Sequence, residues 1–130
     1  MSKVIDPLNL VRAIVEEIHD TKGQDVKVLH LKGLVSYTDY FVLVTGTSNR
    51  HVQAMADRVH LKLKNQHQQL PITFEGYDTG AWVLLDYGDV VLHIFQEEQR
   101  EFYALDDLWV DAPQVDLENS EKTPVNVKSQ

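Results

Sequence analysis

Apolar residues recur at helical spacing in two stretches of the chain, and each stretch has a capping residue at its start. The first helix is predicted to begin at Asp6-Pro7 and to end before Gly23. Asp caps free backbone N–H groups, Pro suits the first helical position, and Gly favours the end of a helix. A second helix is capped by Ser48 or Asn49 and cannot continue through Pro71. The buried stripes are Leu8, Val11, Ile14, Val15 and Ile18 in the first helix, and Val52, Met55, Ala56, Val59 and Leu63 in the second.

Five shorter apolar stretches predict the strands of one mixed sheet. Tyr40 to Val44 is apolar throughout, which is typical of a central strand buried on both faces. The last three strands follow one another through short joins that contain Gly. Such joins favour antiparallel hairpins, because parallel neighbours need a crossover of about a dozen residues. The predicted strands are Asp25 to Lys32, Tyr40 to Val44, Ile72 to Tyr77, Trp82 to Asp86 and Asp89 to Phe95.

The end of the chain divides into a helix and a tail. Glu97 to Trp109 predicts a short helix or helical turn that returns apolar side chains towards the core, namely Phe102, Leu105, Leu108 and Trp109. Residues 112–130 have no aromatic residue and no sustained period, so we interpret them as an extended or disordered tail. We therefore expect one α/β (α+β) domain over residues 1–111. Its predicted order is α-β-β-α-β-β-β-α, with about five strands in a mixed sheet and helices packed on it.

Acidic residues are concentrated in one part of the chain. The formal net charge is −8, and the stretch from Glu75 to Asp111 holds ten acidic residues against the single cation Arg100, a net charge of −9. Such a surface repels phosphate backbones, which are bound by Lys and Arg, so little direct nucleic-acid binding is expected. It attracts a basic protein, although solubility alone also explains many acidic surfaces. Arg100 is expected to form an internal ion pair that fixes the last helix.

The composition also limits compartment and chemistry. The chain has no cysteine, which excludes disulfides, cysteine zinc sites and thiol nucleophiles. It has no apolar run long enough to cross a bilayer and no secretory leader in its first residues, so we expect a cytoplasmic protein without membrane contact.

Catalytic and ligand-binding motifs are incomplete. Thr45-Gly46-Thr47-Ser48 connects a strand to a helix, where backbone N–H groups can bind an anion. It lacks the Lys of a P-loop, and a tight turn followed by a cap explains it without a ligand. No Asp-x-Asp lies on a predicted strand to hold Mg²⁺ for nucleotide transfer. His60 and His67 share a helix face without a third metal ligand, and His93 is interpreted as a hydrogen-bonded, partly buried histidine that faces opposite to Leu92 and Ile94. No metal and no cofactor are expected.

The strand Trp82 to Asp86 and the turn after it give the best candidate for a binding site. Trp82, Leu84 and Asp86 alternate with Val83, Leu85 and Tyr87, so both strand faces carry bulky apolar groups. One face packs on the helices, and the other exposes apolar groups beside carboxylates unless a helix covers it too. Aromatic anchors rimmed by charge are typical of protein interfaces, whereas a lone Trp is more often part of a core. The predicted partner-binding residues are Glu75, Tyr77, Trp82, Leu84, Asp86, Tyr87 and Asp89.

These residues and others, in order along the chain, resemble the ribosomal silencing factor family, also called RsfS or Iojap-like. The resemblance begins near Lys22 and Asp25 and ends at Leu108-Trp109; the tail lies outside it, and Leu105-Asp106 stands where family members commonly have Leu-Glu. The matching segments are Asp39-Tyr40-Phe41-Val42, Thr45-Gly46-Thr47-Ser48-Asn49-Arg50-His51-Val52, Glu75-Gly76, Trp82-Val83-Leu84-Leu85-Asp86-Tyr87-Gly88-Asp89, His93-Ile94-Phe95, Arg100-x-Phe102-Tyr103 and Leu108-Trp109.

The resemblance implies a translational regulator rather than an enzyme. It implies binding to the large ribosomal subunit through a basic ribosomal protein at the intersubunit face, which blocks joining of the small subunit and represses translation. It also implies a nucleotidyltransferase-like fold without the catalytic carboxylates, and a homodimer when the protein is free. Two alternatives remain at this point: a weak or vestigial nucleotide-binding transferase that uses Gly46, Ser48 and carboxylates near Asp86, and a generic dimeric adaptor.

Overall fold

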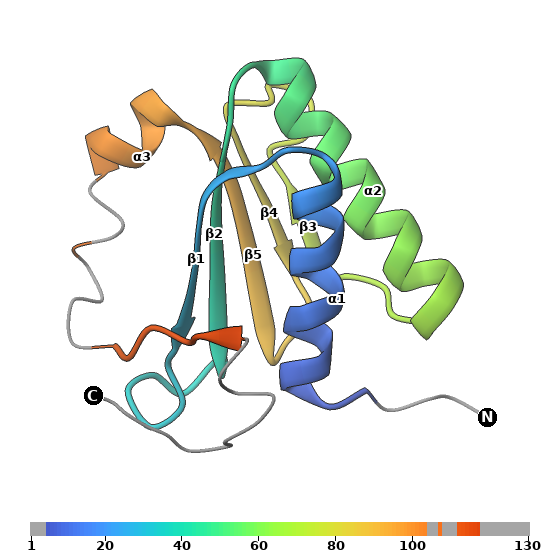
Figure 1. The fold of residues 1–130 in the computed structure, drawn as a ribbon, viewed down its shortest axis with the longest axis vertical. Coiled ribbons are helices and arrows are strands. Elements are labelled where there is room, and N and C mark those ends of the chain that lie inside the picture. The colour runs from blue at the N-terminus through green and yellow to red at the C-terminus, as the bar shows by residue number, and fades with distance from the viewer. Residues whose placement is uncertain (1–4, 104–106, 108–111, 118–130) are drawn as a thin grey trace.

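The predicted strands form a single five-stranded mixed sheet in the computed structural model, which describes residues 5–103, 107 and 112–117. Its strand order is β1-β2-β5-β4-β3 (Figure 1). β2 and β5 are parallel, and the other neighbours are antiparallel, as the short joins predicted for β3, β4 and β5. The strands are β1 Gln24–His30, β2 Tyr40–Gly46, β3 Thr73–Glu75, β4 Trp82–Asp86 and β5 Val90–Gln96.

Two helices cover one face of this sheet, α1 (Pro7–Asp20) and α2 (Asn49–His67) (Figure 1). Asp6 caps α1 by accepting a hydrogen bond from the backbone N–H of Asn9, and Ser48 caps α2 through the backbone N–H of His51. The predicted stripes of both helices, apart from the part-buried Leu8, pack on Val42, Val44, Leu92 and Ile94 of the central strands and form the larger core.

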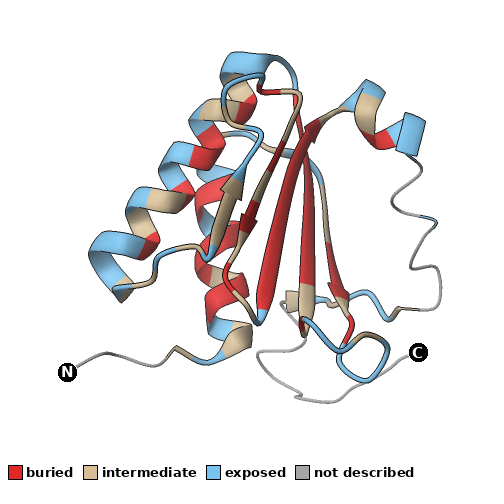
Figure 2. Ribbon diagram, turned by 180° about the vertical axis from the view of Figure 1, so that it is seen from behind, coloured by how far each residue is buried: buried red, intermediate tan, exposed pale blue. Residues whose placement is uncertain are grey.

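The opposite face carries a smaller apolar cluster and is only partly covered. Its buried members are Leu29, Leu31, Phe41, Leu43, Val91 and Phe95. β2 is buried along almost its whole length, as predicted for a central strand, whereas the short edge strand β3 is mostly accessible (Figure 2). The last helix, α3 (Glu97–Tyr103), lies at one end of this second face.

The end of the chain differs in part from the prediction. Phe102 does not return to the core: it is 80% exposed, because α3 directs it away from the sheet. Leu105, Leu108 and Trp109 lie outside the described residues. Residues 113–115 run along the edge strand β1, where the N–H of Val115 donates to Val28 O (2.8 Å) and the N–H of His30 donates to Pro113 O (2.9 Å). A domain boundary at residue 111 stays a prediction.

Candidate protein-binding surface

Trp82 lies on the sheet face that α1 and α2 leave uncovered. Its strand alternates between part-exposed Trp82, Leu84 and Asp86 on this face and buried Val83 and Leu85 on the helix side. The predicted alternation is therefore confirmed. The structure also decides which face is accessible, because both long helices pack on the same side of the sheet. Among the described residues, the Trp82 face is therefore the less covered of the two.

Cross-strand pairing brings an acidic side chain next to this apolar surface. Glu75 of β3 is paired with Leu84, and Thr73 is paired with Asp86, so these side chains project from the same face. Glu75 is exposed. We call Glu75, Trp82, Leu84 and Asp86 the β4 surface; it unites four of the seven predicted binding residues.

The other three predicted residues lie elsewhere. Tyr87 packs in the helix-side core, where burial raises the pKa of its hydroxyl. Tyr77 packs against that same core, and its hydroxyl donates to the carboxylate of Asp57 on α2 (2.9 Å), a contact that raises the tyrosine pKa. Asp89 is exposed in the turn between β4 and β5. A partner role for these three residues stays a prediction.

Asp86 has a structural contact of its own. Its carboxylate accepts a hydrogen bond from the backbone N–H of Gly88 (2.8 Å) and so closes the turn, in which Gly88 has a φ of 91°. A substitution of Asp86 therefore changes the turn as well as the surface charge, and Glu75 is the cleaner position at which to test charge.

The sequence analysis did not identify three residues that surround the β4 surface: Tyr103, His93 and Phe41. The ring of Tyr103 lies 5.0 Å from that of Trp82, and the indole N–H of Trp82 donates to Nδ1 of His93 (3.2 Å). Phe41 packs edge-on against His93, with 4.7 Å between ring centroids. The sequence placed His93 correctly opposite to Leu92 and Ile94, but only the pairing of β4 with β5 reveals its contact with Trp82.

Two acidic side chains around β4, Glu75 and Asp89, are exposed, whereas Asp86 is part-buried and hydrogen-bonded to the turn. Among the described residues, no Lys or Arg forms a salt bridge with Glu75, Asp86 or Asp89; the recorded salt bridges join α1 to Arg58 and Lys62 of α2. Unpaired exposed carboxylates raise the negative potential of a surface and attract a basic partner.

The strand-to-helix turn at Gly46 is occupied by protein contacts. The backbone N–H of Thr47 donates to Nδ1 of His51 (2.9 Å), and the N–H of His51 donates to the hydroxyl of Ser48 (3.0 Å). A Cβ on Gly46 would lie 2.7 Å from a methyl group of Val52, so the glycine is needed for close packing of α2. These contacts support the structural interpretation of the motif over an anion site.

The residues of the transferase alternative do not converge. Gly46 is paired with Gln96 at one end of β5, and Asp86 is paired with Val91 near the other. The two pairs are separated by roughly 16 Å along β5. Among the described residues there is also no cluster of three His, Cys, Asp or Glu side chains that could hold a metal ion.

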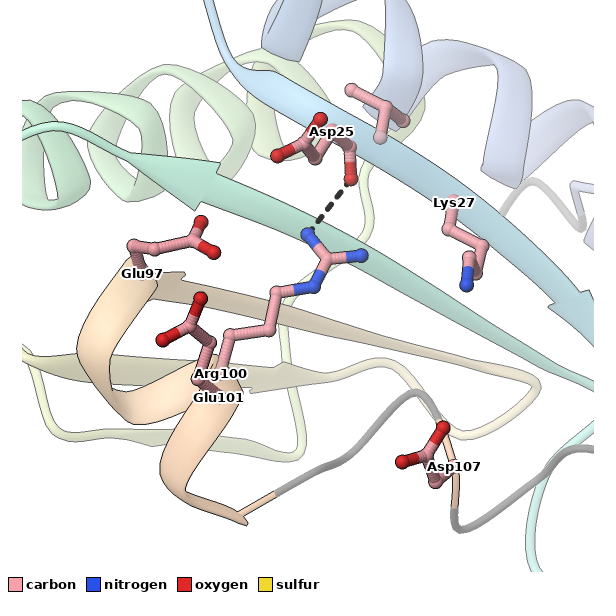
Figure 3. Close-up of a pocket in the computed structure, with 7 residues that line it drawn as sticks. Asp25, Lys27, Glu97, Arg100, Glu101 and Asp107 are labelled. Carbon is pink, nitrogen blue, oxygen red and sulfur yellow. Dashed lines mark hydrogen bonds between the residues drawn. The ribbon is translucent and has the colours of Figure 1, made fainter.

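A separate open pocket of about 590 Å³ lies between α3 and β1, lined by Asp25, Val26, Lys27, Glu97, Arg100, Glu101 and Asp107 (Figure 3). Buried Arg100 donates to the backbone oxygen of Asp25 (2.8 Å) and to the hydroxyl of Thr45 (2.9 Å), so it ties α3 to β1 and β2. The predicted fixing role is supported, although these two acceptors are neutral, and the ion pair of Arg100 stays a prediction. A hydrogen bond with Glu101 raises the pKa of Glu97.

The fold and this surface define a class: a small α/β protein with two helices on one sheet face and an acidic, aromatic surface on the other. No described helix is long and apolar enough to cross a membrane. The family described as "Ribosomal silencing factor during starvation" matches residues 4–130, a range that includes the tail. The chain belongs to this ribosomal silencing factor family.

Individual relatives agree with this membership. Ribosomal silencing factor RsfS of Halalkalibacterium halodurans is 41% identical over 110 residues, which are 84% of this chain and 92% of that protein. The mouse protein "Mitochondrial assembly of ribosomal large subunit protein 1" is 34% identical over 101 residues, 74% of this chain and 43% of the mouse protein. A crystal structure of a Chromobacterium violaceum protein superposes with a TM-score of 0.78 at 34% identity and covers 81% of this chain and 87% of its own. The α+β prediction is confirmed; the nucleotidyltransferase-like label stays a prediction.

Proposed function

We propose that this protein binds the large ribosomal subunit through a basic ribosomal protein at the intersubunit face and so prevents the small subunit from joining. The observation that carries the proposal is family membership, since the matching family is named for ribosomal silencing. The name of the mouse relative refers to the large ribosomal subunit, which supports that subunit as the partner. The proposed site of action is the cytoplasm.

The β4 surface has the physical properties that such docking requires. Trp82 and Leu84 offer apolar area that a partner can desolvate, and tryptophan is enriched among the residues that dominate interface energies. Glu75 lies beside them and attracts Lys or Arg of the partner, which sets register and association rate. Asp89 in the adjacent turn adds to the same field, and buried Tyr87 supports the strand from the other side.

Steric exclusion is the proposed mechanism. Two macromolecules cannot occupy the same part of the intersubunit face, so a bound protein blocks subunit joining without any catalytic step. We further propose that the free protein is a homodimer, because an exposed Trp82 face gains from being covered in the absence of the ribosome. The mass of the free protein by sedimentation equilibrium tests this second statement.

The decisive experiment mixes purified small and large ribosomal subunits with the protein and measures joined ribosomes on a sucrose gradient. The wild type is expected to reduce joining and to co-sediment with the large subunit alone. Trp82→Ala and Glu75→Lys are expected to lose at least about tenfold in affinity, a change typical of interface anchors.

Matched controls keep the assay specific. Leu61→Ala removes a half-exposed apolar side chain from α2. Asp20→Lys makes the same charge change as Glu75→Lys at a 63% exposed position on α1, where it also removes an exposed ion pair with Arg58 of a kind that contributes little to stability. Both controls are expected to bind and inhibit as the wild type does. Unchanged subunit joining with the folded wild type would contradict the silencing proposal, and binding without inhibition would favour an adaptor.

A further inference from the structure

The indole of Trp82 is held by a single hydrogen bond from within the sheet. Its N–H donates to Nδ1 of His93, which lies diagonally across on β5. An imidazole nitrogen that accepts a hydrogen bond carries no proton, so the neutral ring of His93 must carry its proton on Nε2. The contact therefore exists only with the neutral form of His93.

The surroundings of His93 keep it neutral. The side chain is 7% exposed, and the rings of Phe41, Phe95 and Trp82 pack around it. Burial alone lowers the pKa of His93 to about 4. Two charged groups lie on the packed elements: Arg100, whose guanidinium lies over the Phe95 ring, and Glu75, which is paired with Leu84. Neither is a cause of the lowered pKa of His93.

His93 also carries a cost that packing does not explain. Its Nε2 is buried and has no hydrogen-bond partner among the described residues, and an unsatisfied buried donor destabilises a fold. The neighbouring positions of β5 are Val91, Leu92, Ile94 and Phe95, so an aliphatic residue would suit the strand at position 93. Within the described part of the chain, the hydrogen bond from Trp82 is the one polar contact of the His93 side chain.

We propose that His93 is a positioning residue, which holds the indole of Trp82 in the orientation needed to dock on the partner. A side chain that is already ordered loses less conformational freedom on binding, so the complex is tighter for the same contacts. The ring of Tyr103 also packs against the indole, at 5.0 Å between ring centroids. This inference rests on the proposed use of the β4 surface in ribosome binding.

The first test reads the Trp82 indole N–H by NMR in the free protein, so it does not depend on the ribosome. The signal is assigned from its absence in Trp82→Phe. In the wild type we expect a hydrogen-bonded indole N–H that is lost as the pH falls through about 4. In His93→Gln an amide oxygen can accept the hydrogen bond, so the hydrogen-bonded chemical shift of the indole proton is expected to persist without this pH dependence. In His93→Leu the indole proton is expected to show the chemical shift of a free N–H at every pH.

The second test measures affinity for isolated large ribosomal subunits at pH 7. His93→Leu is expected to weaken binding roughly three- to tenfold, the equivalent of one lost neutral hydrogen bond, while its Tm is unchanged or higher. His93→Gln is expected to retain most of the affinity. In a Trp82→Phe background His93→Leu is expected to add no further loss, since the indole N–H is already gone.

His60→Leu provides the control, because His60 on α2 likewise has a buried ring nitrogen without a hydrogen-bond partner among the described residues and lies beside an aromatic ring, Phe74. It is expected to leave both the indole signal and binding unchanged.

The inference is overturned if His93→Leu keeps the wild-type indole signal, or if the affinity losses of His93→Leu and Trp82→Phe simply add. If the wild type itself does not bind large subunits, the proposed function and the docking role of His93 both fail, while the indole signals still report whether His93 orients Trp82. Should His93→Leu fail to fold, the pH titration of the wild type against His93→Gln decides the positioning role.

Discussion

Two single residues on the strands and joins beside β4, Gly76 and His93, contact Trp82 of the β4 surface. Gly76, in the join between β3 and β4, has a φ of 82°, and a Cβ built on it would lie 2.0 Å from the carbonyl oxygen of Trp82. The backbone of the join therefore touches the first residue of β4. His93 supports the same residue from the other neighbouring strand.

Gly76→Ala is expected to destabilise the protein by about 3 kcal/mol, since the new methyl group meets backbone and the positive φ is strained. Gly33→Ala is the matched control, because Gly33 has a φ of 90° but no atom within 4 Å of a built Cβ. That control is expected to cost only about 1 kcal/mol of strain. Equal losses in urea unfolding would show that the close approach to Trp82 does not matter.

His93 is expected to make stability depend on pH. The unfolded chain binds a proton at this residue near pH 6.5, whereas the folded chain does so only near pH 4. Between these values acid favours the unfolded state, so the free energy of unfolding falls as the pH falls. The loss from pH 7 to pH 5 is expected to be about 2 kcal/mol. Urea unfolding of the wild type and His93→Gln at both pH values isolates this contribution, and parallel pH slopes for the two proteins would contradict it.

At the scale of elements, the contact between the two long helices depends on a buried charge. Glu17 of α1 is buried between Arg58 (3.4 Å) and Lys62 (3.0 Å) of α2, and its hydrogen bond raises the pKa of Lys62. Glu16 reaches the same Lys62 at 3.5 Å but is 68% exposed. The two neighbouring glutamates therefore offer a comparison of the same ion pair inside and outside the interface.

Glu17→Gln is expected to lower the free energy of unfolding by about 2 kcal/mol, because it weakens charge-assisted hydrogen bonds that water cannot replace. Glu16→Gln is expected to cost less than about 0.5 kcal/mol, as is usual for exposed pairs. Thermal or urea unfolding of both variants measures the difference; similar losses would contradict a special role for the buried carboxylate.

At the scale of the whole molecule, acidic charge is concentrated in the part of the chain that contains the β4 surface. The net charge is −8, and the acidic stretch Glu75 to Asp111 begins at β3 and includes all of β4. A charge distribution of this kind attracts basic molecules before contact, and salt weakens that attraction.

The association rate with isolated large subunits is expected to fall several-fold between about 0.05 M and about 0.5 M salt. Glu75→Lys is expected to slow association at low salt and to flatten this dependence, whereas Asp20→Lys on α1 leaves both largely unchanged. Rapid-mixing kinetics measure the rates. Equal effects of the two substitutions would show that net charge, not the β4 surface, guides the encounter.

The local pattern predicted most of the fold because α1, α2 and β2 each have an unambiguous period, cap or buried run. The stripe of α2, the cap at Ser48 and the buried run of β2 are all as expected. The third strand is shorter than predicted, since Ile72 to Tyr77 pairs with β4 only from Thr73 to Glu75. Phe102 was expected in the core because sequence cannot tell which way a seven-residue helix at the end of a sheet is turned.

The sequence by itself determined the elements, the concentration of acidic charge and the two faces of β4, because alternation and helical spacing are properties of the local backbone. Only the tertiary structure decided which face of β4 remains accessible, since that depends on α1 and α2 packing on the same side of the sheet. The tertiary structure likewise placed His93 against Trp82, and it placed Tyr87 in the helix-side core. Contacts between strands follow from the pairing register, which no local pattern specifies.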